Sequence, residues 1–169
     1  AGVISPSTTD AGNVHNNTLT ISGLNISARD IFAGYTTGIG NSYNNTVILK
    51  NTTANNSSRA AQVYGGWSAQ GNATNNTVTL AGAAGGAANM YLAVYGGGGN
   101  GTGKDFTSGN LLQVQGKGNE LWYVRNFEKL KFVLNSDVAS GDTMVSNYYS
   151  MQNFDWTKIS VENAATWGT

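Results

Sequence analysis

The 169-residue chain is long enough for one folded domain or for a stretch of a longer repeat array. Its formal net charge is zero, which argues against nucleic-acid binding because that function needs clustered lysine and arginine side chains. The absence of cysteine excludes a disulfide framework and thiolate metal sites.

Paired asparagines introduce a strand-like segment that occurs three times along the chain. The copies are residues 16–23 (NNTLTISG), 44–49 (NNTVIL) and 75–82 (NNTVTLAG), which start 28 and 31 residues apart, and residues 109–116 form a degenerate fourth copy. Polar and apolar residues alternate in each copy, so we expect Val78 and Leu80 to face a core and Thr77 and Thr79 to face outward. Asparagine adopts the left-handed conformation of turns, and amides at equivalent positions can also bond from one winding to the next.

A second motif interleaves with the first at nearly the same period. Its copies are residues 31–35 (IFAGY), 63–67 (VYGGW) and 94–97 (VYGG). Ala33-Gly34 replaces the glycine pair in the first copy, which makes that unit imperfect or a cap. Residues 90–95 predict a strand, and the glycines at 96–99 suit tight corners with positive φ and close backbone approach. Two motifs repeating in register predict a solenoid, a propeller or an array.

The remaining sequence is less repetitive and more highly charged. Residues 126–134 fit a strand with Leu130, Phe132 and Leu134 on one face and Lys129, Lys131 and Val133 on the other, although Phe127 is out of phase. Residues 1–103 are therefore interpreted as repeats, with units near 16–43, 44–74 and 75–103, and residues 104–169 as terminal coils and a cap. No segment has the capped 3.6-residue period of a helix or the length of a membrane-spanning run.

Candidate catalytic chemistry is sparse. The single histidine, His15, has no local nucleophile or carboxylate partner and is interpreted as a loop residue. No two of the nine acidic residues fall at matching repeat positions, whereas a glycosidase needs two carboxylates about one bond. Asp137 and Asp142 lack the glycine-rich calcium pattern, and the Gly96–Gly103 run lacks a phosphate-loop ending. We therefore predict no catalytic residue, no metal ligand and no cofactor.

Aromatic residues recur around the second motif and are the candidate contact residues. They are Tyr35, Tyr64, Trp67 and Tyr95, with Tyr91 nearby. Aromatic rings that carry a polar group suit contact with a sugar or a protein. The alternative, which we favour, is that these rings stack from coil to coil inside the rod.

Across residues 16–99, the NNTVTL and VYGG blocks resemble the passenger regions of bacterial autotransporters, in particular adhesin-like or haemagglutinin-like surface proteins. Residues 126–134 and the following 141–144 (GDTM) resemble a block near the end of such repeat regions. The resemblance implies an all-β fold, a right-handed parallel β-helix with a less regular C-terminal cap. It also implies export through the outer membrane, display on the cell surface, and adhesion without catalysis.

The partners that the resemblance implies are a protein or glycan on the surface of a host cell or a neighbouring bacterium. Membrane attachment would come only through a barrel domain that this chain does not contain, and we expect a monomer or weak self-association. Three alternatives stay open: a polysaccharide-degrading β-helix lyase or glycosidase, a trimeric adhesin, and a β-propeller, which three units of this length do not close.

Overall fold

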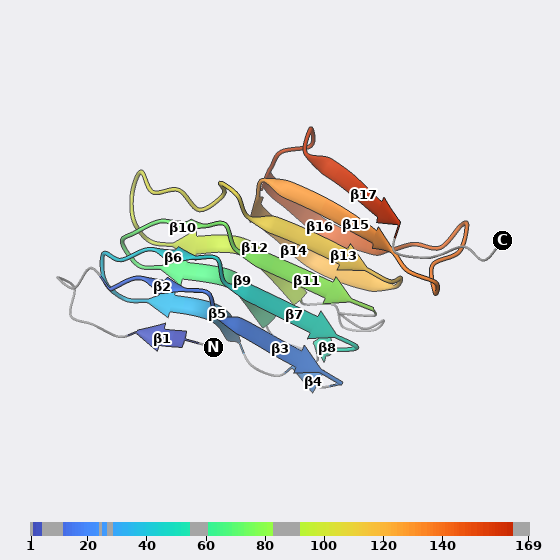
Figure 1. The fold of residues 1–169 in the computed structure, drawn as a ribbon, viewed down its shortest axis with the longest axis horizontal. Coiled ribbons are helices and arrows are strands. Elements are labelled where there is room, and N and C mark those ends of the chain that lie inside the picture. The colour runs from blue at the N-terminus through green and yellow to red at the C-terminus, as the bar shows by residue number, and fades with distance from the viewer. Residues whose placement is uncertain are drawn as a thin grey trace.

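Parallel strands wind into a β-solenoid in the computed structural model, which describes residues 2–4, 12–23, 25–26, 29–54, 61–82 and 92–163 (Figure 1). The strands of the first large sheet, sheet A, are β1 (Gly2–Ile4), β5 (Asp30–Thr36), β9 (Ala61–Ser68), β12 (Leu92–Gly99), β14 (Asn119–Phe127) and β16 (Val145–Phe154). Those of the second, sheet B, are β3 (Thr18–Ser22), β7 (Thr46–Lys50), β11 (Thr77–Ala81), β13 (Leu111–Gln115), β15 (Lys129–Leu134) and β17 (Ile159–Asn163). Both sheets are parallel throughout, which confirms the expected all-β parallel β-helix.

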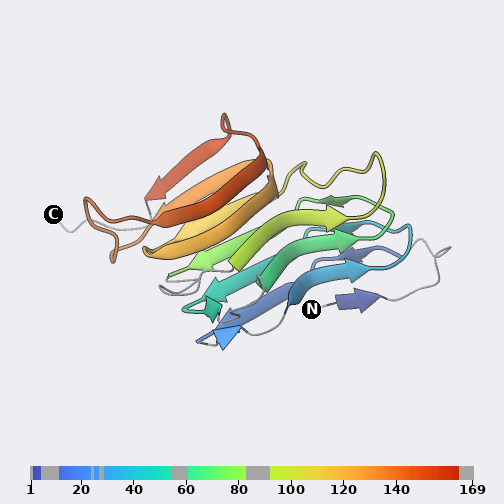
Figure 2. The same ribbon diagram turned by 180° about the vertical axis from the view of Figure 1, so that it is seen from behind.

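Two small sheets complete the cross-section at the N-terminal end. One consists of β2 (Val14–His15), β6 (Ser42–Tyr43) and β10 (Ala73–Thr74), and the other of β4 (Asn25–Ile26) and β8 (Thr53–Ala54). The chain alternates between sheet A and sheet B as it climbs from the N-terminal end to the C-terminal end (Figure 2). Among the described residues, no helix has the length and apolar character that a membrane span requires.

Successive copies of the asparagine motif lie side by side in the solenoid. Val47 pairs with Val78 and Leu49 pairs with Leu80, in continuous register from β7 to β11. The degenerate fourth copy joins the same sheet, because Val78 also pairs with Leu112 of β13. The repeat in the sequence is therefore a repeat of neighbouring layers.

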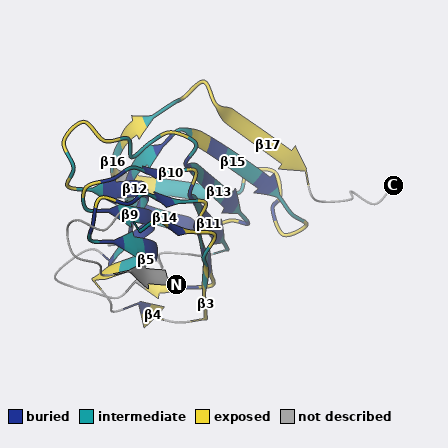
Figure 3. Ribbon diagram, turned by 60° about the vertical axis from the view of Figure 1, so that its left-hand side comes forward, coloured by how far each residue is buried: buried dark blue, intermediate teal, exposed yellow. Residues whose placement is uncertain are grey.

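Aliphatic side chains from sheets A and B meet in one core between the sheets. The central strands β9, β11 and β12 are largely buried, whereas β17 at the C-terminal end is exposed (Figure 3). The largest fully buried side chains are Val47, Leu49, Val63, Val78, Leu80, Leu92, Val94, Leu112, Val114, Leu121, Val124 and Phe127. Val78 and Leu80 thus face inward as expected. Thr79 lies on the opposite side of its strand but is only 6% exposed, because Ile48 and Gln113 flank it on the two neighbouring strands.

The two residues of each asparagine pair have different structural roles, one in a turn and the other in a ladder of hydrogen bonds. The first residue of each pair has positive φ, namely 59° at Asn16, 54° at Asn44 and 55° at Asn75. The second residue is part of a ladder of side-chain amides formed by Asn17, Asn45, Asn76 and Asn110. In it the Nδ2 atom of each amide donates to the Oδ1 atom of the next, at 2.9, 3.1 and 3.3 Å. The predicted turn and the predicted amide ladder are both confirmed.

A second ladder, which the sequence analysis missed, runs along the corner before the short strands. The backbone N–H groups of Asn41 and Asn72 donate to the Oδ1 atoms of Asn13 and Asn41, each at 2.8 Å. The N–H group of Asp105 continues the series by donating to Asn72 Oδ1 at 3.0 Å. Two corners of the solenoid are therefore held by side-chain oxygens that accept bonds from an adjacent winding.

The paired glycines are required for space and not for positive φ. Gly65, Gly66, Gly96 and Gly97 lie within strands β9 and β12, and none of them has positive φ. A Cβ atom on Gly66 would lie 2.6 Å from Nδ2 of Asn76, so the missing side chains make room for the amide ladder. The expectation of close backbone approach is confirmed, and the expectation of tight corners at 96–99 is wrong because the strand continues to Gly99.

The C-terminal windings are less regular, as expected. The segment 126–134 is not one strand, because β14 ends at the fully buried Phe127 and β15 begins two residues later, which explains the phase of Phe127. Leu130 faces the core as predicted, but Val133, expected on the lysine face, is also buried. Residues 111–163 extend both large sheets, with a register shift between Leu121 and Tyr123. The predicted end segment also contains Trp167, which lies outside the described residues.

Glu128 stabilises the corner between β14 and β15 through hydrogen bonds of its carboxylate. Its carboxylate accepts hydrogen bonds from Lys158 Nζ and from the Gly109 N–H, and these bonds, that of Lys158 foremost, hold the pKa of Glu128 below its usual range. A carboxylate with a lowered pKa in the folded state stabilises the protein above its unfolded-state pKa, and this stabilisation is lost as the pH falls.

Glu128→Gln is therefore expected to reduce the loss of stability that acid causes. The measurement is the urea midpoint of unfolding at about pH 6 and about pH 3, where the drop between the two should be smaller in the variant than in the parent chain. Asp137→Asn, which removes an exposed carboxylate elsewhere, serves as the control. An identical drop in the parent and Glu128→Gln would contradict the assignment.

Candidate functional site

A row of aromatic rings lies on the outer face of sheet A. Phe32, Tyr64 and Tyr95 occupy paired positions of β5, β9 and β12. The ring of Tyr64 stacks on that of Phe32 with centroids 5.0 Å apart, and on that of Tyr95 with centroids 4.5 Å apart. The row exists because in-register parallel strands place equivalent residues of successive windings next to one another.

A second, shorter row lies beside the first. Tyr35 pairs with Trp67, and Gly98 follows at the next position. A Cβ atom on Gly98 would lie 2.8 Å from ring atoms of both Trp67 and Tyr64, so these rings extend over the glycine. The indole of Trp67 meets the ring of Tyr64 nearly at a right angle, at 5.2 Å. We call Phe32, Tyr35, Tyr64, Trp67 and Tyr95 together the aromatic face.

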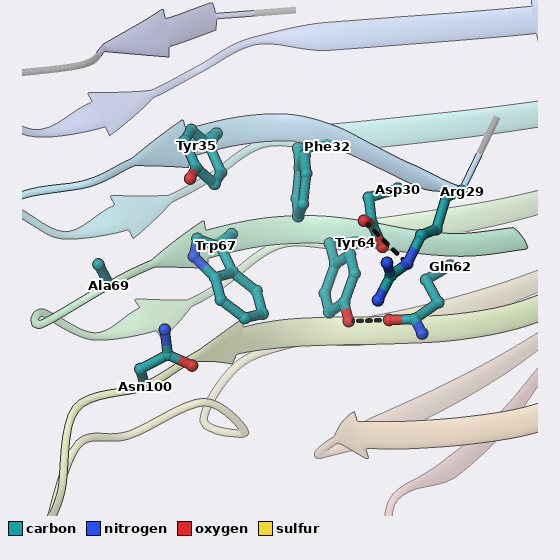
Figure 4. A pocket seen from close by; sticks show the side chains of 9 residues that line it. All are labelled: Arg29, Asp30, Phe32, Tyr35, Gln62, Tyr64, Trp67, Ala69 and Asn100. Atoms are coloured by element: carbon teal, nitrogen blue, oxygen red, sulfur yellow. Dashed lines mark hydrogen bonds and ion pairs between the residues drawn. The ribbon is translucent and has the colours of Figure 1, made fainter.

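A pocket of about 380 Å³ opens on the aromatic face (Figure 4). Its lining combines four aromatic residues with polar ones: Arg29, Asp30, Phe32, Tyr35, Gln62, Tyr64, Trp67, Ala69 and Asn100. At the polar end, Arg29 and Asp30 form an ion pair with Nε and Oδ2 3.6 Å apart. The Tyr64 hydroxyl donates to Gln62 Oε1 at 2.5 Å.

Burial raises the pKa of Tyr64 well above its ordinary value, and the neighbouring Tyr95 and Asp30 raise it further. Burial also raises the pKa of Tyr95. Both phenols are therefore neutral at physiological pH and keep their hydroxyl protons. The pocket thus offers neutral hydroxyl and amide groups beside aromatic rings, a combination suited to binding.

The predicted contact residues come together in the structure. Tyr35, Tyr64 and Trp67 line the pocket, and Tyr95 does not line it but stacks on Tyr64. Stacking from coil to coil is therefore correct for Tyr64 and Tyr95. Neither ring belongs to the aliphatic core cluster, which Val63 and Val94 join from the other side of the same strands, although Tyr64 is only 7% exposed. Tyr91 lies outside the described residues.

The sequence analysis missed Phe32 and the polar residues of the pocket. Phe32 could have been identified from the sequence, since it occupies the place in its motif that tyrosine takes in the later copies. Gln62 stands two residues before Tyr64 and so on the same side of the strand. Arg29 and Asp30 precede the first copy of the motif and have no counterpart at the later ones.

The position that follows Tyr95 in the first aromatic row is occupied by a positively charged residue, Arg125. Arg125 of β14 pairs with Tyr95, and its guanidinium carbon lies 4.6 Å from the centroid of the Tyr123 ring. Tyr123 in turn contacts the rings of Trp122 and Tyr149, at centroid distances of 5.6 and 4.9 Å. The outer face of sheet A therefore carries aromatic side chains from β5 to β16.

Other residues considered in the sequence have structural surroundings. His15 belongs to strand β2 and not to a loop, and its ring stacks on Tyr43 with centroids 4.9 Å apart. The carboxylate of Asp142 accepts bonds from the Ala139 N–H at 2.7 Å and from Lys117 Nζ at 3.0 Å, and both lower its pKa. Within the described part of the chain, no three histidine or acidic residues are grouped as a metal site would require.

A second hollow, of about 390 Å³, lies on the outer face of sheet B near its C-terminal end. Its lining is Leu111, Lys129, Lys131, Lys158, Ile159 and Ser160. Lys131 pairs with Glu162, and Lys158 pairs with Glu128 and Asp155, so much of its charge is already compensated. We regard the pocket on the aromatic face as the stronger candidate site.

The chain matches no protein-family model, no curated protein and no solved structure. The candidate site is therefore defined by its geometry: a partly exposed aromatic surface on a parallel sheet, with one ion pair at one end and Arg125 at the other.

Proposed function

We propose that this chain is a non-enzymatic adhesion module displayed on a bacterial cell surface, and that the aromatic face is its contact surface. The observation that carries the proposal is the stacking of aromatic rings on the outer face of sheet A, where Tyr64 is only 7% exposed but the rings around it are partly exposed. Large rings with few rotatable bonds contribute contact area at a low cost in conformational entropy. Such residues dominate binding energy in known interfaces.

The surroundings of the aromatic face favour binding over catalysis. Asp30 is the one carboxylate among the residues that line the pocket, and it forms an ion pair with Arg29. Hydrolysis of a glycosidic bond ordinarily uses two carboxylates that face the bond. This supports adhesion over the alternative of a polysaccharide-degrading enzyme.

Surface display is proposed from the resemblance of the repeat motifs to autotransporter passengers. The parallel β-solenoid agrees with the architecture that this resemblance implies. In a solenoid each winding contacts only its neighbours, so a rod of this kind can project a binding surface away from a cell. The partner is a protein or a glycan on a host cell or a neighbouring bacterium.

Trp67→Ala is expected to weaken adhesion by about tenfold or more, because it removes a large ring from the centre of the contact surface. The measurement counts beads coated with the chain that attach to cultured epithelial cells and to bacterial cells. Trp156→Ala is the matched control, since Trp156 is 59% exposed and lies outside the aromatic face. Thermal melting of both variants checks that the fold persists.

The two variants distinguish adhesion through the aromatic face from nonspecific attachment. Equal loss in both variants would contradict the proposed contact surface. Beads that attach to neither kind of cell would contradict the proposed function itself.

A further inference from the structure

Arg125 lies at the end of the first aromatic row and has no acidic partner among the residues that the structure describes. None of the ion pairs formed among the described residues includes it. Its Nε atom is buried and has no hydrogen-bond acceptor within the described part of the chain. Buried donors without acceptors are rare in folded proteins and are costly to leave unsatisfied. The side chain as a whole is half-buried, so an acceptor from outside the protein would bind the part of the guanidinium group that solvent reaches, and Nε would stay covered.

The chemistry of this group selects an anion. A guanidinium group binds a carboxylate through two parallel hydrogen bonds, and the ring of Tyr123 supports its plane from one side at 4.6 Å. The charges at the far end of the aromatic face offset each other, because Arg29 pairs with Asp30. Arg125 therefore contributes the uncompensated positive charge along the row that runs from Phe32 through Tyr64 and Tyr95.

Arg125 and the pocket belong to one surface. The paired positions Phe32, Tyr64, Tyr95 and Arg125 lie on four successive strands. Neighbouring strands are about 4.8 Å apart, so the row is roughly 14 Å long. The positive charge of Arg125 also opposes the rise in the pKa of both Tyr64 and Tyr95, which places all three groups within one electrostatic field.

The polar groups beside the row suit hydroxyl groups. Gln62 and Asn100 each offer a donor and an acceptor, and Asp30 offers acceptors, at the edge of the aromatic rings. Sugar hydroxyls both donate and accept, while the C–H faces of sugar rings pack on aromatic rings. A narrow row of rings flanked by such groups fits an extended chain of sugars better than the broad surface of a folded protein.

We propose that the outer face of sheet A binds an acidic oligosaccharide along the solenoid axis, with sugar rings against the aromatic face and a sugar carboxylate on Arg125. This inference rests on the proposed adhesive function and names the class of ligand. The acid is of the uronic or sialic type, because both combine a carboxylate with a pyranose ring.

The test titrates the chain with matched pairs of oligosaccharides that differ in the acid: 3′-sialyllactose against lactose, and trigalacturonic acid against its methyl ester. Binding is followed by calorimetry and by tryptophan fluorescence. We expect at least one acidic member to bind about tenfold or more tightly than its neutral partner, and the preference to shrink at high salt. Arg125→Gln should abolish the preference, and Arg125→Lys should retain part of it.

Lys50→Gln is the control, because it removes an exposed cation from the end of β7 in sheet B, which does not line the pocket. It should leave the preference for acid unchanged. A preference that survives Arg125→Gln, or equal binding of acidic and neutral members, overturns the assignment of Arg125. Melting temperatures of the variants establish that each loss reflects binding and not unfolding.

Bead attachment separates this inference from the adhesive function. If beads attach through Trp67 but none of the oligosaccharides binds or displaces them, the acidic-sugar inference fails while adhesion stands. Displacement by an acidic peptide in place of the sugars would identify a protein partner and would likewise overturn it. Acid-dependent binding of an oligosaccharide without attachment to cells would support the ligand class and count against adhesion.

Discussion

Gly97→Ala is expected to lower the free energy of unfolding by about 3 kcal/mol or more. A Cβ atom at this position would lie 2.2 Å from the carbonyl oxygen of Ala73 and 2.6 Å from that of Phe106. The same two oxygens accept hydrogen bonds from Asn110 Nδ2, at 3.0 and 2.7 Å. Backbone that moves to admit the methyl group must therefore also disturb the C-terminal end of the amide ladder.

Urea denaturation monitored by tryptophan fluorescence measures the effect of this substitution. Gly101→Ala is the matched control, because the atom nearest to its added Cβ is the side-chain Cγ of the exposed Lys104, which can move away. We expect the control to change the free energy of unfolding by less than about 1 kcal/mol. Equal free energies of unfolding for the two variants would contradict the prediction, because the windings would then move apart to admit the methyl group at little cost in stability.

Asn76→Ala is expected to lower the free energy of unfolding by roughly 3 kcal/mol or more, because it removes one of the two inner amides of the ladder. The side chain is fully buried, and its Oδ1 atom accepts bonds from the backbone N–H of Asn45 at 3.0 Å and from Asn45 Nδ2 at 3.1 Å. Its Nδ2 atom donates to the Ser42 carbonyl oxygen at 3.2 Å. Alanine leaves a buried donor and a buried acceptor without partners, and each carries its own desolvation penalty.

Asn75→Gly is the control for Asn76→Ala. Asn75 has a φ of 55°, which glycine adopts without strain, and its side chain is exposed. Chemical denaturation should therefore show only a small change for Asn75→Gly beside the large loss for Asn76→Ala. If the ladder contributed nothing to stability, the two variants would have the same free energy of unfolding, which would contradict this prediction.

The fold was predictable because the pairing of strands copies the repeat in the sequence. The segments at 44–49 and 75–82 are alike, and Val47 pairs with Val78 in continuous register. The amide ladder followed from the same reasoning, since a residue recurring at one corner must meet its own copies. The reason for glycine at positions 66 and 97 was harder to predict from the sequence, because the atoms that a Cβ would meet there come from segments distant in the chain.

The candidate site was only partly predictable. Alternation places Val63 and Tyr64 on opposite sides of a strand, but it does not state which side faces the core. Aliphatic residues and the amide ladder occupy the narrow interior, and the large ring of Tyr64 lies outside. Arg125 was missed because its place beside Tyr95 depends on the pairing of β14, a strand that carries neither repeated motif.

The amides of the first ladder are separated along the chain by 28, 31 and 34 residues, yet each meets the next in the same way. Windings of unequal length therefore share one frame, because the asparagine amides return to the same corner in each winding. Such a scaffold can gain or exchange surface segments while its interior stays unchanged. Diversification of its outer surface, whether in nature or by design, then requires no compensating substitutions in the core.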